Sequence, residues 1–404
     1  MINVIGLGYI GLPTALMLAA SGNNVVGTDV NKGLVKTLNE GKTTFEEEGL
    51  DELFQEALSK GIKFSNDYQV TDKYIITVPT PYDKDNKKID PVYVIKAVQT
   101  VLENCLENTL LIIESTVSPG TIDKYIRPLI EESKFTIGET IHLIHAPERI
   151  LPGNMIHELR YNSRTIGADN LDKGQMVKEI YQTFCEADIA VTDIKTAEMS
   201  KVIENTFRDI NIAFANELAK ICDFDDMDVY EIIKVANMHP RVNILNPGPG
   251  VGGHCISVDP WFLVGDYPEL TNIITTARHI NDSMPDYVLK KVAQIMKEKN
   301  ISDFSKVGVY GLTYKPNVDD TRESPTLQMF ESMERHLSKP LKSYDPMVKN
   351  KIVENQVMDF NEFMDGLELV IIMVGHKHII ENSDRLDSVV VYDTQNIIPE
   401  AITL

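Results

Sequence analysis

One cysteine lies in a stretch of sequence that is unusually rich in glycine. The segment 246–260 places four glycines and two prolines ahead of Cys255, and the carboxylate of Asp259 follows four residues later. Glycine permits positive φ and lets a ligand approach the backbone closely, which favours a binding loop that presents a thiol and a carboxylate. A rigid connector whose cysteine packs as a small hydrophobic residue fits the same stretch. The loop alone therefore leaves both interpretations open.

A second glycine motif predicts a dinucleotide site near the N-terminus. Gly6-Leu-Gly-Tyr-Ile-Gly11 follows an apolar run that starts at Ile2, and precedes a helical pattern at 12–20 and a strand at 25–29. In this order the glycines allow a tight turn and bring backbone N–H groups to a pyrophosphate at the helix N-terminus. Asp29 lies 18 residues after Gly11, where an acid bonds the ribose hydroxyls of NAD and repels the extra phosphate of NADP. NAD is therefore the predicted cofactor.

Polar residues also follow several buried strands. Strands at 73–78 and 110–116 end in Val78-Pro-Thr-Pro81 and Ser115-Thr116, and a strand that begins at Ile141 ends in Glu148. Because ligands lie beyond the carboxyl ends of strands in a doubly wound sheet, these residues are placed to line the cofactor crevice. Each of them, taken singly, also fits a polar strand end that faces water.

A long helical pattern covers 196–222 without proline or glycine, and its length predicts a spine between two lobes. Lys201 and Asn205 are four residues apart, so they share one helical face. Lysine and asparagine on a helix are usually solvated, so the spacing alone assigns them no role. Other helices are predicted at 46–58, 228–235 and 287–298. The first of these is acidic, and we expect it to be a solvated surface helix.

The chain begins a second α/β pattern near Asp303. Strands are predicted at 306–312, 341–345, 369–374 and 389–392, with a helix at 324–333. This half lacks the GxGxxG motif. The connection 313–324 instead offers Lys315 and Arg322, and basic groups after a strand suit a phosphate-bearing second ligand. A surface loop that carries two charges is the plainer alternative.

The composition is that of an ordinary globular protein with 404 residues, long enough for two or three domains. A net charge of −21 argues against nucleic-acid or anionic-membrane surfaces, because no excess of cations is present to displace counterions. We see no stretch of transmembrane length, no signal peptide and no metal-binding spacing. Four scattered cysteines without a disulfide pattern suggest a reducing compartment, for which the cytoplasm is the default.

Taken together, the motifs resemble the nucleotide-sugar 6-dehydrogenases of the UDP-glucose dehydrogenase superfamily over essentially the whole chain. The motifs that carry the resemblance are Gly6-Leu-Gly-Tyr-Ile-Gly-Leu-Pro13, Val78-Pro-Thr-Pro81, Glu114-Ser-Thr116, Ala146-Pro-Glu148, Lys201-Val-Ile-Glu-Asn205, Gly252-Gly-His-Cys255 with Asp259, and Tyr314-Lys315 with Asp320-Thr-Arg-Glu-Ser324. The resemblance implies an α/β fold with two Rossmann-like doubly wound domains joined by a long central helix. We expect an NAD-binding domain at 1–194, a central helical dimerisation domain with the cysteine loop at 195–300, and a UDP-sugar-binding domain at 301–404.

The glycine loop also resembles one branch of the superfamily. His239-Pro-Arg-Val-Asn243 and Pro247-Gly-Pro-Gly-Val-Gly-Gly-His-Cys-Ile256, with Val258-Asp-Pro-Trp261, look like the branch that acts on UDP-N-acetylmannosamine. The UDP-glucose branch usually reads Gly-Phe-Gly-Gly-Ser-Cys-Phe here. The UDP-N-acetylglucosamine branch shares Gly-Gly-His-Cys. The expected substrate is therefore a UDP-N-acetylhexosamine, namely UDP-N-acetylmannosamine, with UDP-N-acetylglucosamine and UDP-glucose as alternatives.

The resemblance implies a four-electron oxidation of the sugar C6 alcohol to a carboxylate, with two NAD+ used in sequence and the product directed to surface polysaccharides. It assigns catalytic roles to Thr116, Glu148, Lys201, Asn205, Cys255 and Asp259. It assigns cofactor contacts to Gly6, Gly8, Tyr9, Ile10, Gly11, Asp29, Val78, Pro79, Thr80, Ser115, Thr116 and Arg322. It assigns substrate contacts to Glu148, Arg149, Lys201, Asn205, Arg208, Arg241, Asn243, Gly252, His254, Tyr314 and Lys315.

In the implied scheme Asp259 acts as base with Lys201 and a water, and the Cys255 thiolate traps the aldehyde as a thiohemiacetal that is oxidised to a thioester. Glu148 or Asp259 then activates the hydrolytic water. The resemblance also implies a homodimer, in which Arg241 reaches the partner's substrate. Two alternatives lie outside the family. A two-domain β-hydroxyacid dehydrogenase would need no thiol, and a non-catalytic NAD-binding protein would have no reason to combine Lys201, Cys255 and Asp259.

Overall fold

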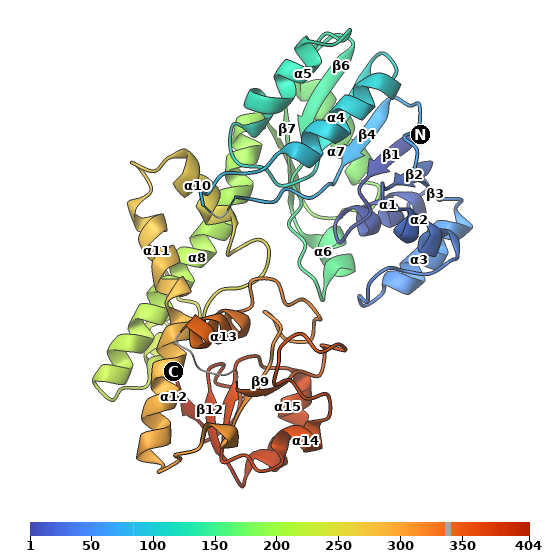
Figure 1. Cartoon of the computed structure of the whole chain (residues 1–404). Coiled ribbons are helices and arrows are strands. Elements are labelled where there is room, and N and C mark those ends of the chain that lie inside the picture. The colour runs from blue at the N-terminus through green and yellow to red at the C-terminus, as the bar shows by residue number, and fades with distance from the viewer. Residues whose placement is uncertain (84, 336–340) are drawn as a thin grey trace. The chain divides into compact units, whose positions relative to one another are not determined.

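The computed structural model describes residues 1–83, 85–335 and 341–404, and these form two compact units, Met1–Glu204 and Asn205–Leu404. One continuous helix, α8 (Ile194–Phe224), contributes residues to both units (Figure 1). It confirms the long helix predicted at 196–222. The three-domain division predicted from the sequence stays a prediction.

The described residues of the first unit contain a sheet with the strand order β3-β2-β1-β4-β5-β6-β7-β8. The strands are β1 (Ile2–Ile5), β2 (Val25–Thr28), β3 (Lys63–Ser65), β4 (Lys73–Ile76), β5 (Thr109–Ile113), β6 (Ile141–His145), β7 (Arg164–Ala168) and β8 (Ile189–Thr192). Neighbouring strands are parallel except β6 and β7, which are antiparallel. The first six strands have the dinucleotide-binding order, in which the connections reverse direction between β1 and β4. Ligands are expected at the carboxyl ends of these two strands.

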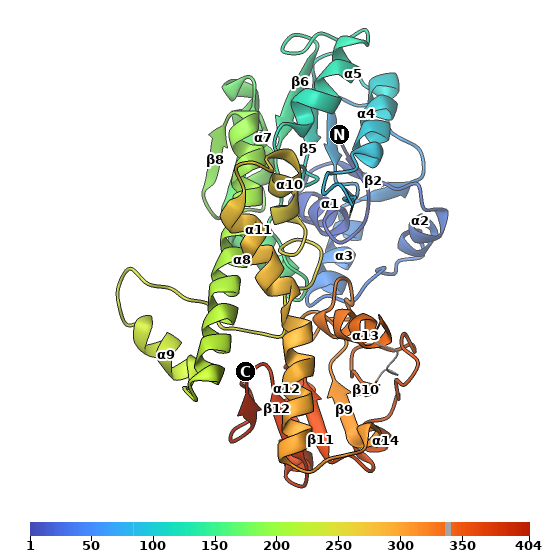
Figure 2. The ribbon, with the colours of Figure 1, turned by 60° about the vertical axis from the view of Figure 1, so that its left-hand side comes forward.

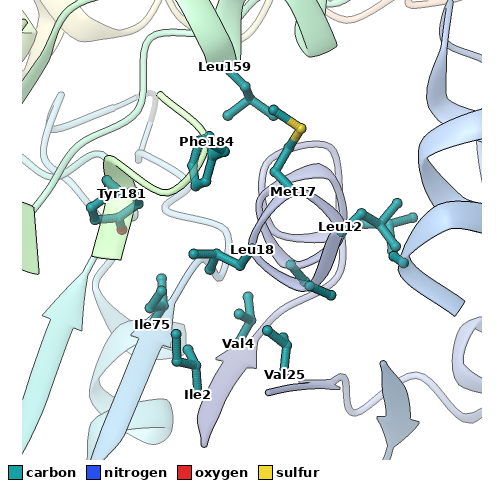
Figure 3. Packing of buried hydrophobic residues seen from close by; sticks show 14 of the residues in the cluster. Ile2, Val4, Leu12, Met17, Leu18, Val25, Ile75, Leu159, Tyr181 and Phe184 are labelled. Carbon is teal, nitrogen blue, oxygen red and sulfur yellow. The ribbon is translucent and has the colours of Figure 1, made fainter. Parts of the chain in front are cut away.

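The helices of this unit pack against the sheet through apolar side chains. They are α1 (Gly11–Ala20), α2 (Lys32–Asn39), α3 (Leu50–Ser59), α4 (Val92–Asn104), the π-helix η1 (Ile122–Ile126), α5 (Arg127–Glu131), α6 (Met155–Tyr161) and α7 (Leu171–Tyr181). One buried cluster joins α1, α3, α6 and α7 to the sheet. Figure 3 shows Met17 and Leu18 of α1 within this cluster, near Leu159 of α6 and Val4 of β1. Nearly every residue of α1 is buried, which holds the helix firmly under the glycine turn.

The acidic helix predicted at 46–58 differs from the structure in two respects. It begins only at Leu50, because Gly49 takes a left-handed conformation with φ 76° and ends the preceding turn. The helix is also not simply solvated, since Leu50, Leu53 and Phe54 are buried in the core of the unit. Its acidic residues occupy the opposite face.

The described residues of the second unit contain an all-parallel sheet with the order β10-β9-β11-β12-β13. The strands are β9 (Val307–Tyr310), β10 (Lys342–Tyr344), β11 (Leu369–Ile372), β12 (Val390–Asp393) and β13 (Ile402–Thr403). The helical elements are α9 (Val229–Ala236), α10 (Asp259–Asp266), α11 (Asn272–Asp282), α12 (Met284–Glu298), η2 (Phe304–Lys306), α13 (Pro325–Arg335), α14 (Phe360–Met364), α15 (Lys377–Glu381) and η3 (Ser383–Leu386).

Helices cover both faces of this second sheet, as in a doubly wound fold. Leu369 and Ile371 of β11 join the cluster that contains α12 and α13, whereas Val370 and Ile372 join the cluster that contains α14 and α15. This alternation follows from the two-residue period of a strand. Figure 2 shows α12 along the sheet beside β11 and β12. The predicted fold class, two Rossmann-like halves and a long helix, is therefore confirmed.

Two details of the second unit were not predicted. Pro285 lies inside the first turn of α12 rather than ahead of the helix, which is tolerated because the first N–H groups of a helix have no partner within it. The short edge strand β13 carries no alternating pattern long enough to identify. Within the described residues, no helix is both long and apolar enough to span a membrane.

Candidate active site

The glycine turn after β1 has the geometry that a dinucleotide requires. Gly6 has φ +91°, and a Cβ on Gly11 would lie 1.8 Å from the carbonyl oxygen of Gly6. A Cβ on Gly8 would meet nothing within 4 Å, so this glycine keeps the backbone open toward a ligand. Thr77 supports the turn by donating to the carbonyl oxygens of Ile5 and Gly6 at 2.9 and 2.6 Å. Sequence reasoning missed Thr77, which looks like an ordinary strand residue.

The N-terminus of α1 remains available for an anion. No side chain caps it at Ile10, and its first turn carries no acidic residue. Tyr9 packs its ring 4.5 Å from that of Phe45. Asp29, half-buried after β2, accepts from the N–H groups of Leu7 and Asn31 at 2.8 Å each. Each carboxylate oxygen keeps a second lone pair for a ribose hydroxyl.

The predicted rim residues gather beyond the carboxyl ends of β4 and β5. The hydroxyl of Ser115 donates to the carbonyl oxygen of Val78 at 2.7 Å and so ties the two strand ends together. Thr80 is buried, Thr116 is half-buried and Pro79 is exposed. Because β1, β4 and β5 are parallel neighbours, these residues lie at the same sheet edge as the glycine turn.

Glu148 lies in a buried group of charges after β6. Its Oε1 accepts from the N–H of Arg149 at 2.6 Å, and its Oε2 forms an ion pair with Arg164 of β7. Arg164 also lies 3.3 Å from Oε1 of Glu114, whose other oxygen accepts from Tyr181 at 3.3 Å. Burial raises the pKa of Glu114 to about 7, with Arg164 opposing the rise and Glu148 adding to it. Sequence reasoning missed Arg164, although a lone arginine in an apolar strand signals a buried partner.

Arg149 uses its side-chain donors within the first unit. Its guanidinium binds Glu204 at 2.6 and 2.8 Å, the carbonyl oxygen of Ser163 and the hydroxyl of Thr165. Arg149 would have to exchange some of these partners to bind a substrate, so its predicted role in substrate binding stays a prediction.

In the second unit, the thiol and the carboxylate of the glycine loop lie one helical turn apart. The N–H of Asp259 donates to the carbonyl oxygen of Cys255 at 2.8 Å, and α10 begins at Asp259. Cys255 is half-buried and Asp259 is 3% exposed. The loop therefore presents the thiol one turn before a helix N-terminus, beside a buried acid, and its catalytic role stays a prediction.

Helix α8 supplies a partner for this acid. The side-chain amide of Asn205 donates to Oδ2 of Asp259 at 2.6 Å, and both groups are buried. Lys201 lies one turn earlier on the same face of α8 and is 6% exposed. The spacing read from the sequence thus holds, and Asn205 is shown to contact a predicted catalytic residue.

The glycine loop packs tightly against the segment that follows β9. A Cβ on Gly252 would lie 2.5 Å from the carbonyl oxygen of Glu323, and a Cβ on Gly253 would lie 2.7 Å from the ring of Tyr314. The N–H of Gly253 donates to the carbonyl oxygen of Arg322 at 2.9 Å. The structure therefore brings together two predicted substrate residues, Gly252 and Tyr314, that are 62 positions apart in the sequence.

Ion pairs and hydrogen bonds also fix the charged residues in and near the segment that follows β9. The guanidinium of Arg322 pairs with Asp320 at 2.6 Å. Asp345 accepts from the N–H groups of Leu312 and Thr313 at 2.6 and 3.0 Å and lies 3.2 Å from His376. The pKa of Asp345 is lowered, because hydrogen bonds and the charge of His376 outweigh the effect of burial. Sequence reasoning missed this support, which depends on strands distant in the chain.

Two further asparagines of α8 hold the loop from the other side. Asn216 accepts from the N–H of Gly248 at 2.9 Å, and Asn211 accepts from the N–H of Leu245 at 2.9 Å. Asn211 also donates to the carbonyl oxygen of Asn243. A repeated asparagine on one long helix could have indicated this role.

The remaining predicted substrate residues lie at the surface of the chain. Arg208, Arg241, Asn243 and His254 are exposed, whereas Lys315 is half-buried. Their roles stay predictions. In the described part of the chain, no group of three or more His, Cys, Asp or Glu residues is arranged to hold a metal ion.

Three family models match the chain in order. Residues 1–185 match the NAD binding domain of the UDP-glucose/GDP-mannose dehydrogenase family, residues 195–283 its central domain and residues 308–400 its UDP binding domain. The chain belongs to this family. The family and the NAD-binding domain predicted from the motifs are therefore confirmed.

Individual relatives cover nearly the whole chain. A protein of Methanocaldococcus jannaschii named UDP-N-acetyl-D-mannosamine dehydrogenase is 42% identical, over 98% of this chain and 92% of that protein. One of Methanococcus vannielii with the same name is 43% identical, again over 98% and 92%. A protein of Ralstonia nicotianae named NDP-N-acetyl-D-galactosaminuronic acid dehydrogenase is 38% identical, over 98% and 96%.

Solved structures of the family have the same fold. The UDP-N-acetyl-mannosamine dehydrogenase Cap5O from Staphylococcus aureus is 41% identical with a TM-score of 0.88, covering 100% of this chain and 96% of that one. The corresponding protein from Pyrococcus horikoshii is 36% identical with a TM-score of 0.91, covering 100% and 98%. The chain is thus an NAD-dependent oxidoreductase of the UDP-sugar dehydrogenase family.

Proposed function

We propose that this chain oxidises UDP-N-acetyl-D-mannosamine at C6 to UDP-N-acetyl-D-mannosaminuronate for surface polysaccharide biosynthesis. The reaction consumes two NAD+ and one water and yields two NADH and three protons. The observation that carries the proposal is the 42% identity, over 98% of the chain, to an enzyme named for this substrate. The motif Gly252-Gly-His-Cys255 supports the same branch of the family.

The first oxidation requires a base for the proton of the C6 hydroxyl. Asp259 takes this role with a bound water, and the Asn205 amide, 2.6 Å from its Oδ2, orients it. NAD+, which the glycine turn after β1 would hold, would supply the hydride acceptor for both oxidations. The Lys201 ammonium stabilises the oxyanion that develops as the proton leaves.

The second oxidation is proposed to pass through the thiol. The Cys255 thiolate adds to the aldehyde carbon, which forms a C–S bond and places negative charge on the aldehyde oxygen. Asn205 and Lys201 stabilise this charge, and loss of the second hydride converts the thiohemiacetal to a thioester. Covalent trapping keeps a reactive aldehyde in the site between the two oxidations.

Hydrolysis then releases the acid. A water placed by Thr116 gives its proton to Glu148, or alternatively to Asp259, and attacks the thioester carbon. The C–S bond breaks and Cys255 leaves as a thiolate. The buried position of Glu148 suits a base that must act on one ordered water rather than on bulk solvent.

The test is a panel of substrates at saturating NAD+. We expect NADH formation with UDP-N-acetylmannosamine to exceed that with UDP-N-acetylglucosamine, UDP-N-acetylgalactosamine and UDP-glucose by about a hundredfold or more in kcat/KM, because a site built to bond a substrate hydroxyl strongly rejects its epimers. UDP-N-acetylgalactosamine is included because the relative from Ralstonia nicotianae is named for N-acetyl-D-galactosaminuronic acid. A different preferred sugar would contradict the assigned substrate, and silence with all four would contradict the enzymatic function.

A second copy of the chain is the proposed partner. Phe207, Phe214 and Ile221 recur every seven residues on α8, and with Phe224 they are 49–89% exposed in the chain. A repeat of seven places large apolar side chains along one stripe of the helix, which is the pattern of a helix–helix interface. We infer a homodimer whose interface includes this stripe. The exposed Arg241 is then available to reach the partner's substrate.

The cytoplasmic location rests on the cysteine pattern of the sequence and stays a prediction. It fits the half-buried Cys255, which the proposed reaction requires as a thiol.

A further inference from the structure

A buried arginine joins two carboxylates at the edge of the first sheet. Arg164 pairs with Oε2 of Glu148 through one guanidinium nitrogen and with Oε1 of Glu114, at 3.3 Å, through the other. All three side chains are at most 4% exposed. The motifs that identify the site contain both glutamates but not the arginine.

The direction of β7 explains why the arginine is there. His145 pairs with Gly167 in the antiparallel register of β6 and β7, and continuing that register places Arg164 opposite Glu148. A parallel β7 would have its first residue at the other edge of the sheet. The one antiparallel pair among the described strands of this sheet therefore brings a guanidinium to the strand end that carries Glu148.

Aromatic rings hold the guanidinium in this position. Its carbon lies 4.5 Å from the ring centre of Tyr181 and 5.3 Å from that of Phe184. Figure 3 shows these two rings within the same packed cluster as Leu18 of α1. The hydroxyl of Tyr181 also donates to Glu114. Arginine suits such a site because its planar fork stacks on rings and reaches two carboxylates at once.

We propose that Arg164 is a positioning residue for the hydrolytic step, holding the Glu148 carboxylate oriented, while Glu114 competes for the same guanidinium. The inference rests on the proposed function, in which Glu148 receives a proton from the water that attacks the Cys255 thioester. In that step a C–O bond forms, the C–S bond breaks and the thiolate leaves. Arg164 does not touch the reacting atoms and acts only through Glu148.

The two neighbours of Glu148 should influence it in opposite directions. The guanidinium holds the Glu148 carboxylate in place, so Arg164→Lys, which lacks the planar fork that reaches two carboxylates, should leave Glu148 poorly aimed at the water. Glu114 draws on the same guanidinium, so Glu114→Gln should leave the guanidinium to Glu148 and should not slow the hydrolytic step. The ionisable groups that face Glu148 in the described contacts are Arg164 of β7, Glu114 of β5 and Tyr181 of α7, and Arg149 next to it turns to Glu204.

The experiment compares Arg164→Lys, Glu114→Gln and Glu148→Gln with the natural protein in single turnovers. Full-length enzyme in excess, saturated with NAD+, is mixed with UDP-N-acetylmannosamine and quenched in acid. NADH is followed by absorbance, and the thioester on Cys255 by intact mass. Arg127→Lys is the matched control, because Arg127 also bridges two carboxylates, Asp123 and Asp169, and Asp169 follows the opposite end of β7.

We expect Arg164→Lys to form NADH at an unchanged rate, to accumulate the thioester and to hydrolyse it at least about tenfold more slowly, as Glu148→Gln also does. Glu114→Gln hydrolyses the thioester at least as fast as the natural protein, and Arg127→Lys changes neither the rate of NADH formation nor the rate of hydrolysis. The rates of NADH formation and of thioester hydrolysis both come from the folded enzyme, so a loss of stability would not change the ratio between them.

Two results would overturn the inference. One is a natural rate of thioester hydrolysis in Arg164→Lys, which would leave Asp259 as the base. The other is an equal slowing of hydrolysis in Arg164→Lys and Glu114→Gln, which would mean that both act only by loosening the fold. In either case the natural protein would still form two NADH per sugar. Failure of the proposed function would instead appear as no NADH from the natural protein.

Discussion

At the scale of single residues, the surroundings of Cys255 separate it from the other cysteines. Burial raises the pKa of the Cys105 and Cys222 thiols, so neither is suited to act as a nucleophile at neutral pH. Cys255 is half-buried at the start of α10, and its carbonyl oxygen is bound by the backbone of Asp259. The proposed nucleophile is thus distinguished by a helix end and a neighbouring acid rather than by its residue type.

Asp29 is expected to set the preference for NAD over NADP. Its carboxylate would repel a 2′-phosphate and bond the ribose hydroxyls. Asp29→Asn removes the charge and keeps an acceptor oxygen for only one of the two N–H groups, of Leu7 and Asn31, that bind Asp29. We expect kcat/KM for NAD+ to fall about 10–100-fold, the range for loss of a charge-assisted hydrogen bond. The ratio of kcat/KM for NAD+ to kcat/KM for NADP+ should decrease as well.

The measurement is kcat/KM for both dinucleotides with the same sugar. Val30→Ala, a neighbouring substitution of an exposed side chain, serves as the control. An unchanged NAD+ to NADP+ ratio in Asp29→Asn would show that the acid does not face the ribose.

Single residues also show which parts of the site could be predicted from the sequence. The glycine motifs and Cys255 could be recognised because the spacing of neighbouring residues identifies them. Arg164 and His376 could not, because their partners come from strands that only the folded sheet places beside them. A buried charged residue is identified by its ion-pair partners, and the strand topology decides which partners lie beside it.

At the scale of elements, the glycine loop depends on close packing at only some of its glycines. A Cβ on Gly252 would lie 2.5 Å from a backbone oxygen and 2.8 Å from Cβ of Tyr314, whereas a Cβ on Gly248 would meet nothing within 4 Å. We expect Gly252→Ala to lose about a hundredfold or more in kcat, because displacing the loop by an ångström misplaces Cys255.

Gly248→Ala is the matched control, and its kcat should stay near that of the natural protein. Steady-state kinetics, together with a thermal melt of both variants, separate displacement of the loop from unfolding. Equal activity of the two variants would contradict the contact with the segment after β9.

Elements with a continuous apolar pattern in the sequence were predicted well, and elements without one were not. The α8 helix and the strands that start at Ile2, Lys73 and Val307 have extended apolar patterns that determine their type. The start of α3 depended on the left-handed conformation of Gly49, and β7 was missed because its polar first residue interrupts the apolar run. Local conformation and tertiary partners decided these cases.

At the scale of the whole molecule, the apolar stripe on α8 predicts a dimer. Phe214→Asp would place a charge in the middle of that stripe, and an unpaired charge in an interface costs several kcal/mol, on the order of 2–5. We expect this variant to sediment as a monomer and to lose activity, because in the proposed dimer Arg241 of one chain completes the site of the other. Phe304→Asp, at a residue 56% exposed in the second unit, is the control and should sediment like the natural protein.

A fully active monomer of Phe214→Asp would contradict the completion of the site by a partner. A dimer that survives the substitution would show that the stripe lies outside the interface.

The central claim is that one site carries out a four-electron oxidation through Cys255. The most direct test is the amount of NADH formed at the end point from limiting UDP-N-acetylmannosamine with excess NAD+. The account predicts two NADH per sugar for the natural protein and no more than one for Cys255→Ala, with Cys105→Ala unchanged at two. One NADH per sugar from the natural protein, or two from Cys255→Ala, would contradict it.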